Sequence, residues 1–273
     1  MQSKVSGEHK VGRLRTGGDL SPGIGRRGIL IPWRDTEVAK HYLERFHHAI
    51  PYLNDQTQVA LDVLAHDRLE VRRFLDLGCG DGRLTDDILK TYPDANAVLV
   101  DCSRHMLEQA AQRLASKQSQ VSCVLQDYSD EGWTASYCDM APFDLVVSSY
   151  SIHHQPDRAK YVLYQDIFRL LRPGGWFMHI EHVAARSPWG QELWDDLMID
   201  RLYTAAQAAH EETSKAAIRE QYLARPDRQE NRLTDVNAQC QWLRKIGFAE
   251  VDCFFKYLQL AVFGGRRPME PTK

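Results

Sequence analysis

The sequence predicts an α/β fold built on a doubly wound, mostly parallel sheet. The first observation is the stretch 71–101, where an apolar run ends at Leu77, a glycine-rich turn follows, and a helix-period segment leads to a second apolar run that ends at Asp101. Strand, glycine turn, helix, strand and acid is the order of a nucleotide-binding βαβ unit. The second observation is that further apolar runs alternate with helix-period segments, as parallel strands require: 121–125, 143–149 and 176–183.

The composition narrows the class of protein. The chain has 273 residues, 43% hydrophobic and 26% charged, which suits one large domain with a packed core. The net charge of −3 gives no reason to expect a nucleic-acid partner, and no apolar run approaches the length of a membrane span. Six cysteines without a CxxC pair indicate reduced thiols, so we expect a cytoplasmic protein.

The N-terminal part is expected to differ from the rest. Residues 1–28 are polar and glycine-rich without a period, so we expect a flexible arm, and the domain proper is expected over 29–273. A basic arm can touch RNA or a phosphorylated partner, but a solvated tail is the simpler interpretation. Apolar stripes at helical spacing predict N-terminal helices over 35–49 and 55–65.

The glycine turn has a physical role and a discriminating spacing. Gly78 and Gly80 permit positive φ and close approach of a ligand to the backbone. A dinucleotide fingerprint would need a third glycine where Arg83 stands. Asp76 behind the turn suits an ammonium group better than a pyrophosphate, and Asp101 can accept from two ribose hydroxyls.

The segments after Asp101 continue the alternation as far as residue 187. Ser103 is a natural N-cap for a helix over 103–116. A second amphipathic helix is expected over 159–171, and Arg172-Pro173-Gly174-Gly175 should end it with a tight turn into the strand 176–183.

The C-terminal third departs from the alternation. Residues 187–234 predict two helical segments and a charged break, which we interpret as a helical cap insertion at the active-site edge; a dimer-interface helix is the alternative. A helix is expected over 235–246, followed by strands over 250–255 and 258–263 joined by a tight turn at 256–257.

The segments LDLGCGDG, VLVD and LLRPGG resemble the motifs of class I methyltransferases that depend on S-adenosylmethionine (SAM), of the type 11/12-like kind. The resemblance covers about 70–183 well and the C-terminal part more loosely. It implies a Rossmann-like, seven-stranded sheet with a C-terminal antiparallel hairpin whose last strand is inserted in the sheet, N-terminal helices over the cofactor mouth, and SAM as cofactor. A looser similarity to carboxy-SAM synthases is also present.

The resemblance implies a cofactor site at the carboxyl ends of the first four strands. Met106 is expected to pack on adenine, although plain core packing is the alternative, and Asp127 is expected to accept from the adenine amino group, with a simple turn residue as the alternative. The full expected set is Asp76, Gly78, Cys79, Gly80, Asp101, Cys102, Met106, Asp127, Tyr128 and Ser149.

The end of the fourth strand should face the transferred methyl group. The catalytic candidates there are Tyr150 and His153, and Glu181 lies at the same edge. Imidazole takes a proton near neutral pH, but two adjacent histidines cannot both point into one pocket. The alternative is that His153 packs against the cofactor and His154 caps the next helix. No third ligand is apparent by spacing, so no metal is expected.

The expected reaction is methyl transfer to an O, N, S or C atom of a small-molecule acceptor, for which an in-line approach matters most and a base is optional. One alternative is a carboxy-SAM synthase-like enzyme that modifies SAM, with Arg225 or Arg228 for the extra carboxylate. Others are a tRNA or protein methyltransferase and a non-catalytic SAM-binding subunit. A homodimer is a further candidate.

Overall fold

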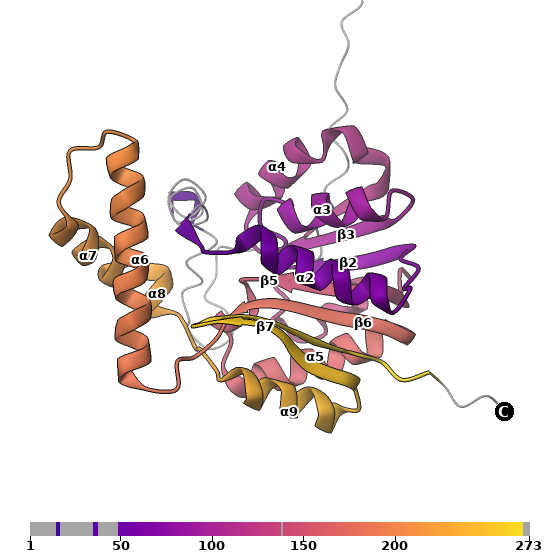
Figure 1. Ribbon diagram of the computed structural model, residues 1–273. Helices are drawn as coiled ribbons and strands as arrows, with labels where there is room; N and C mark the ends of the chain where they lie inside the picture. The colour runs from indigo at the N-terminus through magenta and orange to yellow at the C-terminus, as the bar shows by residue number, and fades with distance from the viewer. Residues whose placement is uncertain (1–14, 17–34, 38–48, 138, 270–273) are drawn as a thin grey trace, which may run out of the picture.

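The computed structural model describes residues 15–16, 35–37, 49–137 and 139–269. The strands in these residues form one sheet, and their order is β1-β4-β3-β2-β5-β6-β8-β7. Figure 1 shows the sheet with its helices. The predicted seven strands are β2 to β8, and β1 (Arg15–Thr16) adds a two-residue parallel pairing to β4 at one edge. The remainder of the expected arm, and residues 38–48 of the helix expected over 35–49, lie outside the described residues.

The centre of the sheet is parallel. Its strands are β2 (Arg73–Leu77), β3 (Asn96–Asp101), β4 (Val121–Leu125), β5 (Phe143–Ser149) and β6 (Leu171–His182). β2 lies between β3 and β5, so the strand order reverses there. In such sheets the ligand crevice lies outside the carboxyl ends of the strands at this switch point.

The last two strands form the predicted antiparallel hairpin. They are β7 (Ala249–Tyr257) and β8 (Leu260–Arg266), and β8 is inserted between β6 and β7. The turn prediction at 256–257 was wrong, because β7 continues to Tyr257 and the turn is formed by Leu258 and Gln259. Leu258 adopts φ 50°, which its side chain gave no reason to expect.

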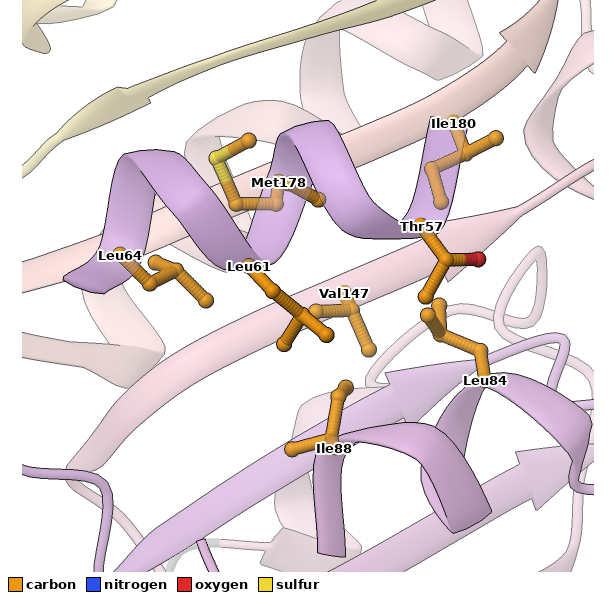
Figure 2. Close-up of a pocket in the computed structure, with 9 residues that line it drawn as sticks. Thr57, Leu61, Leu64, Leu84, Ile88, Val147, Met178 and Ile180 are labelled. Carbon is orange, nitrogen blue, oxygen red and sulfur yellow. The ribbon is translucent and has the colours of Figure 1, made fainter. Parts of the chain in front are cut away.

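Helices cover both faces of the sheet. One face packs against α2 (Leu53–His66), α3 (Arg83–Thr91) and α4 (Arg104–Arg113), and the other against α5 (Asp157–Leu170) and α9 (Val236–Ile246) (Figure 1). Figure 2 shows a small apolar pocket where Leu61 of α2 and Ile88 of α3 meet Val147 of β5. Its wall is almost wholly aliphatic, so it belongs to the core between α2, α3 and the sheet.

β6 begins five residues earlier than expected. Leu171 already pairs with Phe143, whereas the sequence predicted a turn up to Gly175. Gly174 adopts φ 76°, and its N–H donates to the Arg267 carbonyl at 2.8 Å. The two glycines therefore form an irregular stretch within the strand, which the register shift between β5 and β6 accommodates.

The helices expected in 187–234 are α6 (Pro188–Ala208), α7 (Lys215–Ala224) and the single turn α8 (Pro226–Gln229). They stand beside the sheet at the end where β6 runs into α6 (Figure 1). We call them the cap. The cap has its own apolar core, in which Trp194, Met198 and Ile199 of α6 pack against Ile218 and Tyr222 of α7.

Three properties of the described residues bear on function. None of their helices is long and apolar enough to cross a membrane. No group of three or more metal-ligating side chains is found in this part of the chain. All five cysteines in it are free thiols: Cys79, Cys102, Cys123, Cys240 and Cys253.

Candidate cofactor and acceptor site

The glycine loop crosses the carboxyl end of β3. The N–H groups of Gly78 and Cys79 both donate to the Val100 carbonyl, at 2.8 and 3.1 Å. Gly78 adopts φ 67°, and a Cβ atom there would lie 1.8 Å from Ser151 Oγ. Gly80 adopts φ 54°, but nothing described lies within 4 Å of its Cβ position. The loop is therefore packed tightly at Gly78 and open at Gly80.

Asp101 holds the loop from the end of β3. Its buried carboxylate accepts from the Gly80 N–H at 2.9 Å and from the Ser103 N–H at 2.8 Å. Burial, helped by the nearby Asp127 charge, raises the pKa of Asp101 to about 6. Ser103 is the N-cap of α4, as expected, and accepts from the Met106 N–H.

Asp76 lies behind the loop with no exposed surface. Its Oδ2 accepts from the Thr85 hydroxyl at 2.7 Å, but Oδ1 has no hydrogen-bond partner among the described residues. Burial raises the pKa of Asp76 to about 7. A buried carboxylate oxygen without a donor is costly, and a cation beside it would offset that cost.

An open cleft of about 690 Å³, bordering solvent included, lies in front of the loop. Eight of the ten residues expected to bind the cofactor line it, whereas Asp76 and Cys79 are buried behind it. Four further residues line it: the catalytic candidate Tyr150, and Ser151, His154 and Gln155. Ser151 and Gln155 follow β5, whose parallel pairing with β2 brings this segment against the glycine loop, where Ser151 packs on Gly78.

The other side of the cleft carries Tyr128 and Tyr150. The Tyr128 hydroxyl and Ser151 Oγ are hydrogen-bonded at 2.6 Å. Tyr150 has φ 51°, and its hydroxyl donates to Gln56 Oε1 of α2 at 2.7 Å. The bond to Gln56 engages the hydroxyl proton of Tyr150, which makes this residue a poorer acid or base than expected.

Glu181 is the centre of a buried polar cluster next to the cleft. Its Oε1 accepts from His153 Nδ1 at 2.6 Å and from the His182 N–H at 2.7 Å. Its Oε2 accepts from the His153 N–H at 2.9 Å and from His179 Nε2 at 2.8 Å. Burial alone would raise the pKa of Glu181, but the neighbouring His153 and His179 hold it well below its usual range. Glu181 is therefore an ionised carboxylate.

Three imidazoles connect this cluster with the cleft and the cap. The His153 ring lies 4.0 Å from that of His154, which lines the cleft, and 5.7 Å from that of His182. The His182 ring lies 5.5 Å from Trp194 of the cap. Burial lowers the pKa of His182 to about 3 and that of His154 well below its usual range. His154 and His182 are therefore neutral near pH 7.

The arginines proposed for an anion differ in their surroundings. Arg228 is held by Asp195 in a two-pronged ion pair with N–O distances of 2.8 and 2.9 Å. Arg225 stacks on the Tyr222 ring at 4.7 Å and lies 3.5 Å from Asp227. Each arginine therefore already has a carboxylate partner, and the ion pair of Arg228 is the shorter of the two.

The comparisons with known proteins agree with this geometry. A family model described as "Methyltransferase domain" matches residues 74–175. A trans-aconitate 2-methyltransferase of Methylobacterium radiotolerans is 31% identical over 209 residues, which cover 71% of this chain and 75% of that protein. The chain belongs to the class I SAM-dependent methyltransferase family. It is accordingly a methyltransferase that uses SAM as methyl donor and acts on a small molecule.

One further relative and one solved structure are similar to this methyltransferase. A carboxy-S-adenosyl-L-methionine synthase of Nautilia profundicola is 19% identical over 229 residues, 84% of this chain and 92% of that one. The solved structure of an O-methyltransferase family protein from Burkholderia thailandensis matches with a TM-score of 0.53 at 16% identity. It covers 78% of this chain and 56% of that chain, and at this identity it shows the shared fold.

Proposed function

We propose that SAM occupies the cleft in front of the glycine loop. Asp101 would accept from the ribose hydroxyls, Met106 and Asp127 would contact the adenine, and the open space at Gly80 would admit the ligand to the backbone. Asp76 Oδ1 supports a cationic ligand, because it is a buried acceptor with no described donor. The three carboxylates at 76, 101 and 127 together favour a ligand that carries positive charge.

We further propose that the acceptor is a small molecule with an ionisable hydroxyl group, bound between the cleft and the cap. The observation that carries this proposal is the pair of His153 and Glu181. Because Glu181 is ionised, it accepts a hydrogen bond from the Nδ1–H of His153. This tautomer leaves His153 Nε2 as a proton acceptor. The ring has one neighbour on the cleft wall, His154, and another towards the cap, His182.

The residues would then act as follows. Bound SAM supplies an electrophilic methyl group on its sulfonium. His153 Nε2 takes the hydroxyl proton of the acceptor as the new O–CH₃ bond forms, and the bonding pair of the broken S–CH₃ bond stays on sulfur. Glu181 stabilises the imidazolium that results. The neutral His154 and His182 add no positive charge that would oppose this protonation.

A carboxylate acceptor is the second candidate. It is favoured by the relative that matches over most of its length, which is a trans-aconitate 2-methyltransferase. A carboxylate is already ionised near pH 7 and needs no base. It would need a cation, for which Arg225 or Arg228 of the cap would have to exchange its present carboxylate partner.

A comparison of acceptors separates these two reactions. Methyl transfer from isotope-labelled SAM would be measured with trans-aconitate and with a panel of phenols and enols. With a hydroxyl acceptor, His153→Ala should lower kcat by about 10²–10⁴-fold, and Glu181→Gln should lower it as well. The matched control is His66→Ala on the exposed end of α2. Rapid methylation of trans-aconitate that His153→Ala leaves unchanged would refute the base.

The carboxy-SAM alternative is tested by mass spectrometry of the nucleotide released from purified protein. SAM or its demethylated product supports the proposed reaction, and a carboxylated form contradicts it. A cytoplasmic location and a homodimer remain proposals. Removing residues 1–28 should leave small-molecule turnover intact, whereas an enzyme that acts on nucleic acid would lose affinity in a salt-dependent way.

A further inference from the structure

The buried partner of Glu181 on the side away from the cleft is His179. The two residues are two apart on β6, so their side chains leave the same face of the sheet, towards α5 and α9. His179 has no exposed surface, and its ring lies between Phe177, at 5.4 Å, and Phe263, at 4.8 Å. No water-filled surface is available to this imidazole, so its protons are set by its hydrogen bonds.

The hydrogen bonds beyond His179 have a fixed direction. Gln239 Nε2 donates to the Thr234 carbonyl at 3.1 Å, which turns the amide oxygen of Gln239 towards Tyr164. The Tyr164 hydroxyl donates its single proton to Gln239 Oε1 at 2.6 Å. Towards His179 Nδ1, 3.3 Å away, the Tyr164 oxygen can therefore act only as an acceptor.

The other ring nitrogen also faces an acceptor. His179 Nε2 lies 2.8 Å from Oε2 of Glu181, an ionised carboxylate that accepts from four groups. A neutral imidazole carries one N–H and one lone pair. It would have to direct that lone pair at the oxygen of either Tyr164 or Glu181, and both are buried.

We propose that His179 is a buried imidazolium, protonated on both ring nitrogens, that serves as the counter-ion of Glu181 and positions His153. The proposal rests on the proposed role of His153 and extends it. A buried carboxylate needs one compensating positive charge. If His179 supplies that charge, His153 stays neutral, with Nδ1–H on Glu181 and a free lone pair on Nε2. His179 is then a positioning residue that touches no substrate.

Other titratable groups surround the pair. Those that act on Glu181, or on which Glu181 acts, are His153, His154, His182, Tyr128, Tyr164 and Lys160. Burial lowers the pKa of Lys160, and its ammonium group is engaged by the Arg232 carbonyl and Thr234 Oγ1 rather than by Glu181. His179 is therefore the group in direct contact with Glu181 whose second proton would balance the buried charge.

The direct test is the protonation of the ring nitrogens. Two-bond ¹H–¹⁵N correlation spectra of ¹⁵N-histidine-labelled protein at pH 7.5 should show one imidazole with both nitrogens protonated. This signal should be missing in His179→Gln. His153 should show a protonated Nδ1 and a bare Nε2. A neutral His179, with one bare nitrogen in the wild-type spectrum, would overturn the proposal. No acceptor is needed, so failure of the methyl-transfer proposal would not alter this result.

A matched pair of tyrosine variants gives a second measurement. Tyr164 and Tyr137 are both fully buried, and each donates to a glutamine Oε1, Gln239 at 2.6 Å and Gln126 at 2.8 Å. Tyr164→Phe should remove the acceptor of His179 Nδ1–H, so the second proton should leave His179 and His153 should become doubly protonated. Tyr137→Phe should leave both spectra unchanged. An unaltered His179 signal in folded Tyr164→Phe protein would also refute the proposal.

Discussion

Replacing Asp76 by Asn should make the protein more stable and its cofactor binding weaker. Asp76 has no exposed surface, its pKa is raised by burial from 3.8 to about 7, and Oδ1 has no described partner. At 1.36 kcal/mol per pKa unit, ionising this carboxyl in the folded protein costs about 4 kcal/mol. Asn keeps the shape of the side chain and an oxygen that can accept from Thr85.

The effect has a defined dependence on pH. Between about pH 4 and pH 7 the unfolded chain has lost the Asp76 proton while the folded protein retains it, so the free energy of unfolding falls as pH rises. Above about pH 7 both states are ionised and the full cost of about 4 kcal/mol is present. Asp76→Asn should therefore match wild type near pH 4, exceed it by about 2 kcal/mol at pH 5.5, and exceed it by up to about 4 kcal/mol at pH 8.

Urea unfolding of the cofactor-free protein at these pH values measures the first effect. Titration calorimetry with SAM at pH 8 measures the second, for which we expect at least about tenfold weaker binding, or about 1.4 kcal/mol. Asp62→Asn is the control, because Asp62 is an exposed carboxylate on α2. If Asp76→Asn leaves both stability and affinity at pH 8 unchanged, the cation role of Asp76 is wrong.

Two further substitutions test the packing around the site. Gly78→Ala should lower Tm in calorimetry, because the new Cβ would lie 1.8 Å from Ser151 Oγ at a φ of 67°. Adding Ser151→Gly should recover part of the lost Tm. A double variant without any recovery would contradict the clash. Lys160→Met should lower the free energy of unfolding, measured in urea, by about 2–4 kcal/mol, because the Arg232 carbonyl and Thr234 Oγ1 would lose their buried donor. Lys90→Met on the surface is the control. Equal effects of the two lysine variants would refute the anchoring role of Lys160.

The glycine-loop side of the candidate site could be derived from signals that are local in the sequence. The turn from Gly78 to Gly80, the acid at the end of β3 and the N-cap at Ser103 lie within one βαβ unit, and each has a geometric reason visible in the sequence. The existence and type of the helices and strands from α2 to β8 could be predicted for the same reason, since apolar periods extend over whole elements, whereas the start of β6 and the turn after β7 could not.

The acceptor half could not be predicted in this way. The close contact between Ser151 and Gly78 forms between segments far apart in the sequence, and His179 meets Tyr164 and Gln239 only once α5 and α9 pack on β6. When a histidine lies within an apolar strand, the sequence does not indicate whether its imidazole is neutral or protonated. The start of β6 was missed because its pairing depends on Gly174 and the distant Arg267.

The insertion of β8 has a consequence for how the chain is made. During synthesis β6 emerges well before its outer partner, and β7 emerges with no strand to pair with, because its described pairing is to β8 alone. Val262 and Phe263, both without exposed surface, fill the two cores on either side of the sheet. Until residues 260–266 leave the ribosome, the growing chain presents an open strand edge of the kind that aggregates.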